Sequence, residues 1–355
     1  MSQTYNICSI FARISNNLSV NPMSTKSILG MGNALTDILA ILPDDSWLER
    51  FHLPKGSMQH VDEKTGDKIW HELKKMGVQY VAGGSAANTL TGTAVFGLRS
   101  GFIGKVGDDE LGSLYDSDLG RNGICSRLLK GQAASGRAMV FITPPNGERT
   151  FAVYLGAAVE LGPEDLKPEF FEGYDYFHIE GYLVQNQKLL RRAVELAKQA
   201  GLFVSLDLAS YNVVESNRTF LHDIVTNYVD LVFANESEAK AFTGGLEPEE
   251  ALAEISALCQ VAVVKIGKEG SLVQSGENVY RIGVRPAATK DATGAGDLYA
   301  AGFLYAHAEG MPLSVCGEIG SIIAAKVVEV VGPKIDIPRW KAAKQEIRDL
   351  MAQYR

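Results

Sequence analysis

The residues best suited to chemistry lie in the run Asp291-Ala-Thr-Gly-Ala-Gly-Asp297, which is followed at once by an apolar helical pattern. A glycine-rich turn that opens a helix presents free N–H groups at the positive end of the helix dipole, and phosphate is a natural anion for such a site. Gly294, Ala295 and Gly296 would form this cradle, and Asp297 would face the group that attacks the phosphate. The alternative is a structural turn in which Asp297 only complements the dipole.

A second segment of this kind is Gly83-Gly84-Ser85-Ala-Ala-Asn88-Thr89, which also opens a helical pattern. Gly83 and Gly84 allow a ligand to approach the backbone closely, and Asn88 can both donate to and accept from a diol. The structural alternative is a glycine-rich loop with Ser85 as the helix cap.

A third segment, Gly30-Met-Gly-Asn33-Ala-Leu-Thr-Asp37, follows the first predicted strand. It resembles half of a dinucleotide-binding fingerprint, but Leu35 stands where the third glycine belongs, so a dehydrogenase is disfavoured. Asn33 and Asp37 instead read as polar groups at the carboxyl end of a strand, where open α/β sheets bind ligands. As structural residues they would be a turn-forming Asn and a helix-capping Asp.

Short apolar runs that alternate with helical patterns must position these segments. The predicted strands cover 27–32, 101–106, 176–179, 202–206, 231–234 and 261–266, and the predicted helices cover 86–95, 188–200, 236–243, 249–258 and 298–309. This alternation predicts an α/β fold with a parallel sheet covered on both faces. Residues 39–62 and 135–160, the latter with a hairpin pattern around Pro-Pro-Asn-Gly, are expected to form a small β lid.

Composition excludes several classes of function. The chain has 355 residues, a net charge of −8 and no prominent basic run, which argues against nucleic-acid binding. Its four cysteines lack CxxC spacing and its six histidines form no metal-binding pair, so neither zinc nor a disulfide framework is expected, and a cytoplasmic location fits. No apolar run reaches the roughly 18 residues of a membrane span. Residues 1–22 read as a poorly ordered extension before the globular part at 23–355, with Met23 as the natural start.

The segments at 83–89 and 291–303 together closely resemble the two signatures of the PfkB/ribokinase family of carbohydrate and nucleoside kinases, in order and in separation. The resemblance runs from Ser27 to the end of the chain. It implies a ribokinase-like three-layer α/β fold, with a mostly parallel central sheet and a small β lid. It also implies transfer of the γ-phosphate of ATP, with Mg²⁺, to an alcohol group of a small molecule.

The resemblance also implies roles for single residues. Asp297 would be the catalytic base, and Gly294, Ala295 and Gly296 the anion hole. Asn235-Glu-Ser-Glu238 matches an N-x-x-E motif, so Glu238 would handle Mg²⁺, mainly through water. Asp291 lies where family members can bind a monovalent cation, which makes K⁺ a candidate. The expected nucleotide-binding residues are Asn235, Glu238, Lys265, Gly267 and Gly270; Lys265 stands where the family often has Thr and would either reach a phosphate or be solvated.

The acceptor is expected to be a nucleoside, because the pattern from Gly32 to Asp37 resembles that of adenosine kinases. Residues implied to bind the acceptor are Asn33, Asp37, Gly83, Gly84 and Asn88, and the lid residue Arg149 would act at the phosphates, unless it is a surface charge. Phe151, Tyr154 and Tyr182 are candidates for stacking on a purine or are lid core, and the segment 180–182 either lines the acceptor pocket or is a plain loop. The rivals are a ribokinase- or fructokinase-type sugar kinase and a catalytically silent sugar or nucleotide sensor. The enzyme would be a monomer or a lid-mediated homodimer.

Overall fold

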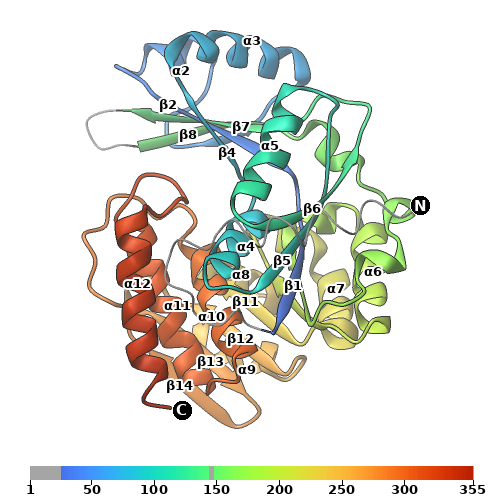
Figure 1. The fold of residues 1–355 in the computed structure, drawn as a ribbon, viewed down its shortest axis with the longest axis vertical. Helices are drawn as coiled ribbons and strands as arrows, with labels where there is room; N and C mark the ends of the chain where they lie inside the picture. The colour runs from blue at the N-terminus through green and yellow to red at the C-terminus, as the bar shows by residue number, and fades with distance from the viewer. Residues whose placement is uncertain (1–24, 144–147, 355) are drawn as a thin grey trace.

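The computed structural model describes residues 25–143 and 148–354. The proposed extension at 1–22, the Met23 start and the Pro-Pro-Asn-Gly turn at 144–147 lie outside these residues. Figure 1 shows a large α/β body with a smaller sheet above it.

The larger sheet contains the six apolar runs that the sequence predicts as strands, together with three strands that were not predicted, Ile124–Lys130, Ser271–Ser275 and Asn278–Ile282. Within the described residues, nine strands pair in the order β14 (Asn278–Ile282), β13 (Ser271–Ser275), β12 (Val261–Lys265), β11 (Leu231–Asn235), β10 (Phe203–Asp207), β9 (Tyr176–Glu180), β1 (Ser27–Met31), β5 (Arg99–Val106) and β6 (Ile124–Lys130). All neighbours from β12 to β6 run parallel, and the β12–β13 and β13–β14 pairs are antiparallel. The expected mostly parallel sheet is confirmed.

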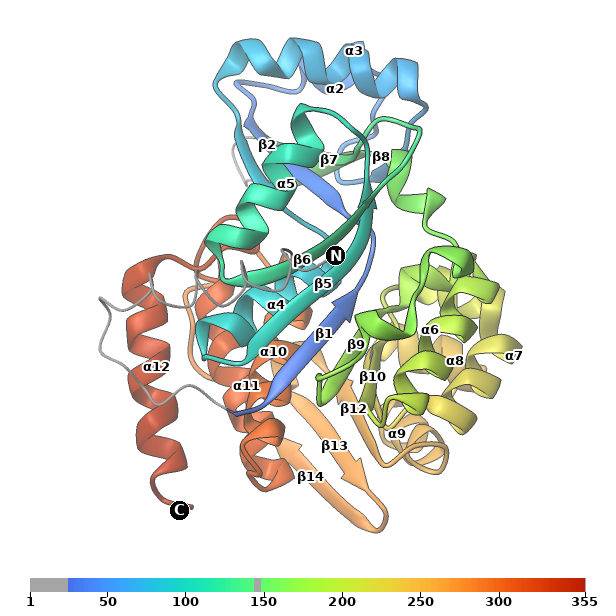
Figure 2. The same cartoon turned by 45° about the vertical axis from the view of Figure 1, so that its right-hand side comes forward.

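Helices cover both faces of this sheet (Figure 2). One apolar core lies under α4 (Ser85–Val95), α10 (Ala295–Ala308), α11 (Leu313–Val327) and α12 (Ile337–Met351). The other lies under α6 (Gln187–Gln199), α7 (Tyr211–Tyr228), α8 (Glu236–Thr243) and α9 (Pro248–Ser256). Two cores on opposite faces explain why the central strands read as continuous apolar runs rather than as alternating ones.

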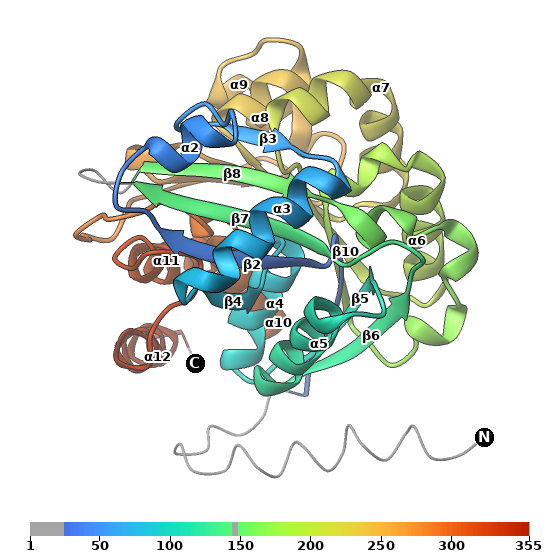
Figure 3. The ribbon, with the colours of Figure 1, turned by 90° about the horizontal axis from the view of Figure 1, so that it is seen from above.

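The smaller sheet forms a lid above the carboxyl ends of the parallel strands (Figures 1 and 3). Its strand order is β3 (Met58–His60), β8 (Glu148–Tyr154), β7 (Gly136–Thr143), β2 (Leu35–Ile41) and β4 (Gln79–Ala82). The helices α2 (Ser46–Arg50) and α3 (Glu63–Leu73) cover its outer face, and α5 (Glu110–Arg121) packs against both the lid core and the main core. The sheet thus holds the two segments expected in the lid and, in addition, residues 35–38 and 79–82.

The strand β2 shows why the lid has two different faces. Thr36, Ile38 and Ala40 are buried under the helices, whereas Leu35, Asp37 and Leu39 are partly buried and Ile41 is 77% exposed on the other side. This alternation with period two leaves one lid face turned toward the large sheet.

Candidate active site

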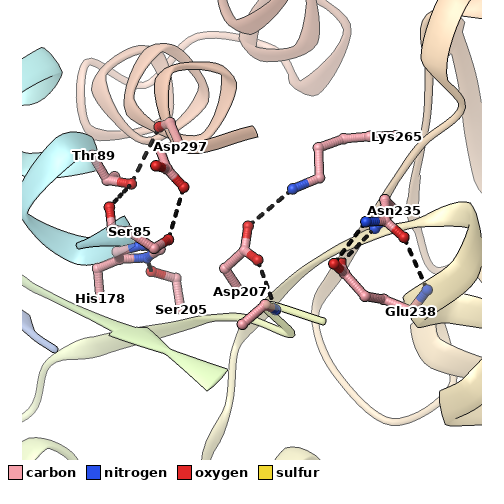
Figure 4. A network of polar contacts seen from close by, with 10 residues as sticks. Ser85, Thr89, His178, Ser205, Asp207, Asn235, Glu238, Lys265 and Asp297 are labelled. Carbon is pink, nitrogen blue, oxygen red and sulfur yellow. Dashed lines mark hydrogen bonds and ion pairs between the residues drawn. The ribbon is translucent and has the colours of Figure 1, made fainter. Parts of the chain in front are cut away.

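Asp297 lies on the first turn of α10, after Gly294, which caps the helix in the left-handed conformation at φ 75°. Its Oδ1 accepts a hydrogen bond from Ser85 Oγ at 2.8 Å, and its Oδ2 accepts one from Asn88 Nδ2 at 2.9 Å. Thr89 Oγ1 donates to the Asp297 carbonyl oxygen at 3.2 Å. Figure 4 shows the carboxylate beside Ser85 and Thr89 of α4, so the two glycine-rich segments meet at one carboxylate, although Ser85 and Asp297 are 212 positions apart.

The surroundings of Asp297 leave it poised to take up a proton. Burial raises the pKa of Asp297, while the hydrogen bond from Asn88 acts in the opposite direction. Asn88 also has a buried Oδ1 with no hydrogen-bond partner among the described residues. A ligand hydroxyl that reached this place would therefore find an unused acceptor beside the carboxylate.

The N-terminus of α10 has the form expected of an anion cradle. A Cβ at Gly294 would lie 2.6 Å from Pro333 Cβ, and a Cβ at Gly296 would lie 3.0 Å from Lys265 Nζ. Small residues therefore keep this turn open, and the Lys265 ammonium lies beside it. Ala295 N already donates to the Ala292 carbonyl oxygen at 3.1 Å, while the helix dipole and the nearby cation favour a negatively charged ligand here.

Asp37 faces the same region from the lid. Its side chain fills the space next to Gly83, where an added Cβ would lie 2.2 Å from Asp37 Oδ1. Burial raises the pKa of Asp37 to about 7; the cations Lys334 and Arg149 oppose this rise, and Asp297 adds to it. The expectation that Asp37 lies at the carboxyl end of the first strand is wrong, because the chain crosses over after Asn33 and enters lid strand β2.

Asn33 does lie just beyond the end of β1, where Glu180 fixes it. The backbone N and the Nδ2 of Asn33 both donate to Glu180 Oε1, at 2.8 and 2.9 Å, and Ala86 N donates to Glu180 Oε2 at 3.1 Å. Burial raises the pKa of Glu180 to about 7. Gly84, at φ 88°, has room only for a hydrogen, since a Cβ would lie 2.5 Å from the Asn33 carbonyl oxygen. Glu180 thus braces the loops that carry Asn33 and α4.

A second polar group lies at the carboxyl ends of β10, β11 and β12 (Figure 4). Lys265 Nζ forms an ion pair with Asp207 Oδ2 at 2.9 Å, and Lys265 is the register partner of Asn235. Burial disfavours the charged form of Lys265, but Asp207 and Glu238 outweigh this effect and raise its pKa. Lys265 is therefore a buried cation next to α10 rather than a solvated one.

Asn235 and Glu238 cap helix α8 reciprocally. Asn235 Oδ1 accepts from Glu238 N at 2.9 Å, while Asn235 N and Nδ2 donate to the two Glu238 carboxylate oxygens at 2.8 and 2.7 Å. Burial, with the neighbouring Asp207 charge, raises the pKa of Glu238 to about 7. The alternative that Glu238 is a solvated helix residue is wrong, since its exposed fraction is 3%.

The loop after β12 holds the remaining predicted nucleotide residues. Gly267 and Gly270 have φ of 54° and 102°, and a Cβ at Gly270 would lie 1.9 Å from the Ile282 carbonyl oxygen. The turn back into β13 therefore accounts for both glycines, and their contact with a nucleotide stays a prediction.

Arg149 connects the lid to the turn that precedes α10. Its Nη2 lies 2.5 Å from Asp291 Oδ2, and its Nη1 donates to Thr293 Oγ1 at 2.9 Å. Asp291 Oδ1 also accepts from Thr293 N at 3.0 Å, and Asp291 Oδ2 from Gly332 N at 2.7 Å. The reading of Arg149 as a surface charge is wrong, because its side chain is only 10% exposed.

The described residues contain neither a cluster of metal ligands nor a membrane-spanning helix. Across residues 25–143 and 148–354, the structure groups no three His, Cys, Asp or Glu side chains that could hold a metal ion. A Mg²⁺ ion here would need water and phosphate oxygens to complete its shell, which is how Mg²⁺ is commonly bound with one or two carboxylates. In the same residues, none of the helices has the length and apolar character to cross a membrane.

Comparison with known proteins bears directly on this geometry. Residues 62–340 match the model of the pfkB family of carbohydrate kinases. The chain belongs to this family. A probable sugar kinase from Rhizobium etli CFN 42 superimposes with a TM-score of 0.81 at 32% identity, and adenosine kinase from Sinorhizobium meliloti with 0.80 at 34%; each covers 91% of this chain and 99% of the other. Adenosine kinase from Saccharomyces cerevisiae is 26% identical over 333 residues, or 87% of this chain and 96% of the yeast protein.

These similarities confirm the predicted family and the ribokinase-like α/β fold with a smaller second sheet. PfkB kinases are phosphotransferases that act on hydroxyl groups of sugars or nucleosides, so this chain is an enzyme of that class. Membership of the family does not decide whether the acceptor is a sugar or a nucleoside.

Sequence reasoning assigned no role to Asp207 and Lys334, and it treated Glu180 only as part of a segment that lines the acceptor pocket or is a plain loop. Asp207 forms an ion pair with Lys265, and Glu180 accepts a hydrogen bond from Asn33. The Lys334 charge lowers the pKa of Asp37. Asp207 and Glu180 could have been found as acidic residues that directly end predicted strands. Lys334 carries no comparable signal in the sequence.

Proposed function

We propose that this PfkB kinase transfers the γ-phosphoryl group of ATP to the primary hydroxyl of a nucleoside, with adenosine as the first candidate. The observation that carries the proposal is the buried Asp297 carboxylate, held by Ser85 and Asn88 at the N-terminus of α10 with the Asp37 carboxyl facing it from the lid. This arrangement supplies a base, an anion site and a group that can orient the acceptor.

In the proposed reaction Asp297 accepts the proton of the acceptor hydroxyl as that oxygen forms a bond to the γ-phosphorus. The bond from this phosphorus to the leaving oxygen of ADP breaks in the same transfer. Gly294, Ala295 and Gly296 would donate N–H groups to the transferred phosphoryl oxygens, and Lys265 would add positive charge. Phosphoryl transfer depends mainly on positioning and charge stabilisation, which is what these groups offer.

The acceptor would be held from both sides. Asp37 would accept hydrogen bonds from two sugar hydroxyls, and the unused Asn88 Oδ1 would accept another. Gly83 and Gly84 would let the ligand approach the backbone, and Asn33 would line the same end of the sheet. Fixing the sugar ring at several points places its primary hydroxyl in line with the phosphoryl group.

The lid favours a nucleoside over a simple sugar. Register and alternation place Leu39, Val140 and Phe151 on the same lid face as Asp37 and Arg149. An apolar face beside polar sugar-binding groups suits a planar base and would stay uncovered above a small sugar. Tyr154 lies on the opposite lid face, with the Arg137 guanidinium 4.9 Å from its ring, so we do not propose it for stacking on a purine. Adenosine kinases are among the similar proteins.

The residues present fit the expected cofactors. Glu238 and Asp207 are buried acidic residues near Lys265, and burial, with the Asp207 charge as a second cause, raises the pKa of Glu238 to about 7; a divalent cation would favour its charged form. Mg²⁺ bound there, mainly through water, would neutralise phosphate charge. Asp291 remains the candidate for a K⁺ effect, although Arg149, Thr293 and Gly332 already contact both of its oxygens.

A kinase screen tests the proposal and its rivals. The full chain is assayed with ATP and Mg²⁺, with and without K⁺, against nucleosides, ribose and fructose, by measuring ADP release. We expect adenosine or a related nucleoside to give the highest kcat/KM. Turnover confined to ribose or fructose would support the sugar-kinase rival, and ligand binding without turnover would support the silent sensor. The proposed location is the cytoplasm, and light scattering would decide between a monomer and a lid-mediated dimer.

A further inference from the structure

Lys334 lies in the segment between α11 and α12. The two residues before it, Gly332 and Pro333, pack on the turn that precedes α10. Gly332 N donates to Asp291 Oδ2 at 2.7 Å, and Pro333 packs so closely on Gly294 that a Cβ there would lie 2.6 Å from Pro333 Cβ. The backbone leading to Lys334 is therefore fixed against the anion cradle itself.

The Lys334 ammonium is buried, and its Nζ has no hydrogen-bond partner among residues 25–143 and 148–354. Burial lowers the pKa of Lys334, and three carboxyl groups act in the opposite direction, each from a different element: Asp118 on α5, Asp37 on β2 and Asp297 on α10. Asp118 is already engaged, since its Oδ2 accepts from Ala82 N at 2.8 Å. A buried ammonium without a hydrogen bond is energetically unfavourable. A ligand oxygen next to Lys334 Nζ would supply the missing hydrogen bond.

Lys334 differs in this respect from the other two cations around Asp297. Arg149 is held by Asp291 and Thr293, and Lys265 is held by Asp207. Arg149 Nη2 also lacks a hydrogen bond, but it forms an ion pair with Asp291; among residues 25–143 and 148–354, Lys334 is the one of these three cations with neither an ion pair nor a hydrogen bond.

We infer that Lys334 is a further catalytic residue, which donates to an oxygen of the transferred phosphoryl group from the acceptor side. The inference rests on the proposed function of the same site. Asp37 and the Asn88 oxygen can serve the acceptor hydroxyls, whereas an ammonium with free donors best matches an anion. Lys265 lies at Gly296 on the nucleotide side and Lys334 lies near Asp37 on the acceptor side. The migrating group would therefore be between two ammonium groups throughout the transfer.

The test compares Lys334→Gln and Lys334→Arg with wild type, using the acceptor that the screen identifies. Lys334→Gln should lower kcat about 100-fold, the size of effect seen when one donor to a developing negative charge is removed, with the acceptor KM within about threefold. Lys334→Arg should recover most of kcat. Lys341→Gln, an exposed position on α12, makes the same charge change and should leave both constants unchanged.

A pH profile separates this role from a structural one. Lys334 lowers the pKa of Asp37, and Arg149 acts in the same direction while Asp297 opposes them. Without the Lys334 charge, the acidic limb of the kcat/KM profile should move to higher pH. A variant that is merely loosened would lose activity at every pH alike, with a lower thermal midpoint.

Two results would overturn the inference: a kcat for Lys334→Gln within threefold of wild type, or a rise in acceptor KM with kcat unchanged. If no acceptor in the panel is phosphorylated, the proposed function fails instead. The inference is then tested by calorimetric titration, which measures the affinity of the protein for inorganic phosphate in the presence of ADP and Mg²⁺. Weaker binding by Lys334→Gln than by Lys341→Gln would sustain the phosphoryl contact, and equal binding would refute it.

Discussion

Replacing Asp297 with Asn is the most direct test of the proposed chemistry, because the hydrogen bonds around this side chain can be kept in the variant. Ser85 Oγ can donate to the new amide oxygen as it does to Asp297 Oδ1. Asn88 Nδ2 would face the new NH₂ group, but Asn88 can turn its amide over and accept with its unused Oδ1. Both hydrogen bonds then survive, and the carboxylate charge is lost without a cavity.

The magnitude follows from this geometry. A positioned general base contributes about 10²- to 10⁴-fold in rate, which equals roughly 2.7 to 5.4 kcal/mol of activation free energy at about 1.36 kcal/mol per tenfold. We expect kcat to fall by this amount, with KM for ATP and for the acceptor nearly unchanged. The thermal midpoint should not fall, because burial already disfavours the charged form of Asp297 and raises its pKa.

The assay is steady-state ADP release, with differential scanning fluorimetry on the same samples. Ser85→Ala is a matched control that removes one hydrogen bond and keeps the carboxylate, so it should retain far more activity than Asp297→Asn. A kcat for Asp297→Asn within tenfold of wild type would refute the assignment of Asp297 as the base. A collapse of the thermal midpoint would refute the amide exchange at Asn88.

Four other predictions concern the supporting residues. Asp37→Ala should raise the acceptor KM about 10- to 100-fold, as expected for lost hydrogen bonds to a charged group, with KM for ATP unchanged in initial-rate kinetics; an effect on ATP alone would contradict the acceptor assignment. Gly83→Ala, whose Cβ would lie 2.2 Å from Asp37 Oδ1, should also raise the acceptor KM, whereas Gly120→Ala, which meets nothing within 4 Å, should leave kinetics unchanged. The thermal midpoint of the ligand-free protein should fall from pH 5 to pH 8, because burial raises the pKa of Asp37 from 3.8, and those of Glu180 and Glu238 from 4.5, to about 7, and the stability present below the lower values is lost as pH rises through the higher one; Asp37→Asn should reduce this slope by the Asp37 share and leave the rest. Lys265→Met should cost about 3–5 kcal/mol in urea unfolding by leaving Asp207 unpaired, and adding Asp207→Asn should restore much of it; an additive double variant would contradict the pairing.

The parallel sheet was predictable because each of its central strands is buried on both faces. The prediction at 231–234 differs from β11 (Leu231–Asn235) by one residue, and the helix at 236–243 coincides with α8. A continuous apolar run that ends in a polar residue is a strong local signal for a buried strand. The two glycine-rich segments could also be identified from the sequence. The structure brings them together at Asp297.

The supporting contacts were not predictable in the same way. Asp37 reads as a residue after a strand, since only the tertiary fold shows that the chain continues into a second sheet at Leu35. The Lys334 ammonium is buried next to Pro333, which packs on Gly294, a contact between residues 39 positions apart that no local pattern encodes. Charged residues read as solvated from sequence unless a partner is known, so Lys334 and Lys265 had no basis for a firmer assignment.

The ion pair between Arg149 and Asp291 joins the lid directly to the turn that begins the catalytic helix. Any outward swing of the lid must first separate these two charges. Because the side chains are only 10% and 11% exposed, dissolved salt will screen them much less than it screens a surface pair. The rate at which the lid opens should therefore depend only weakly on ionic strength.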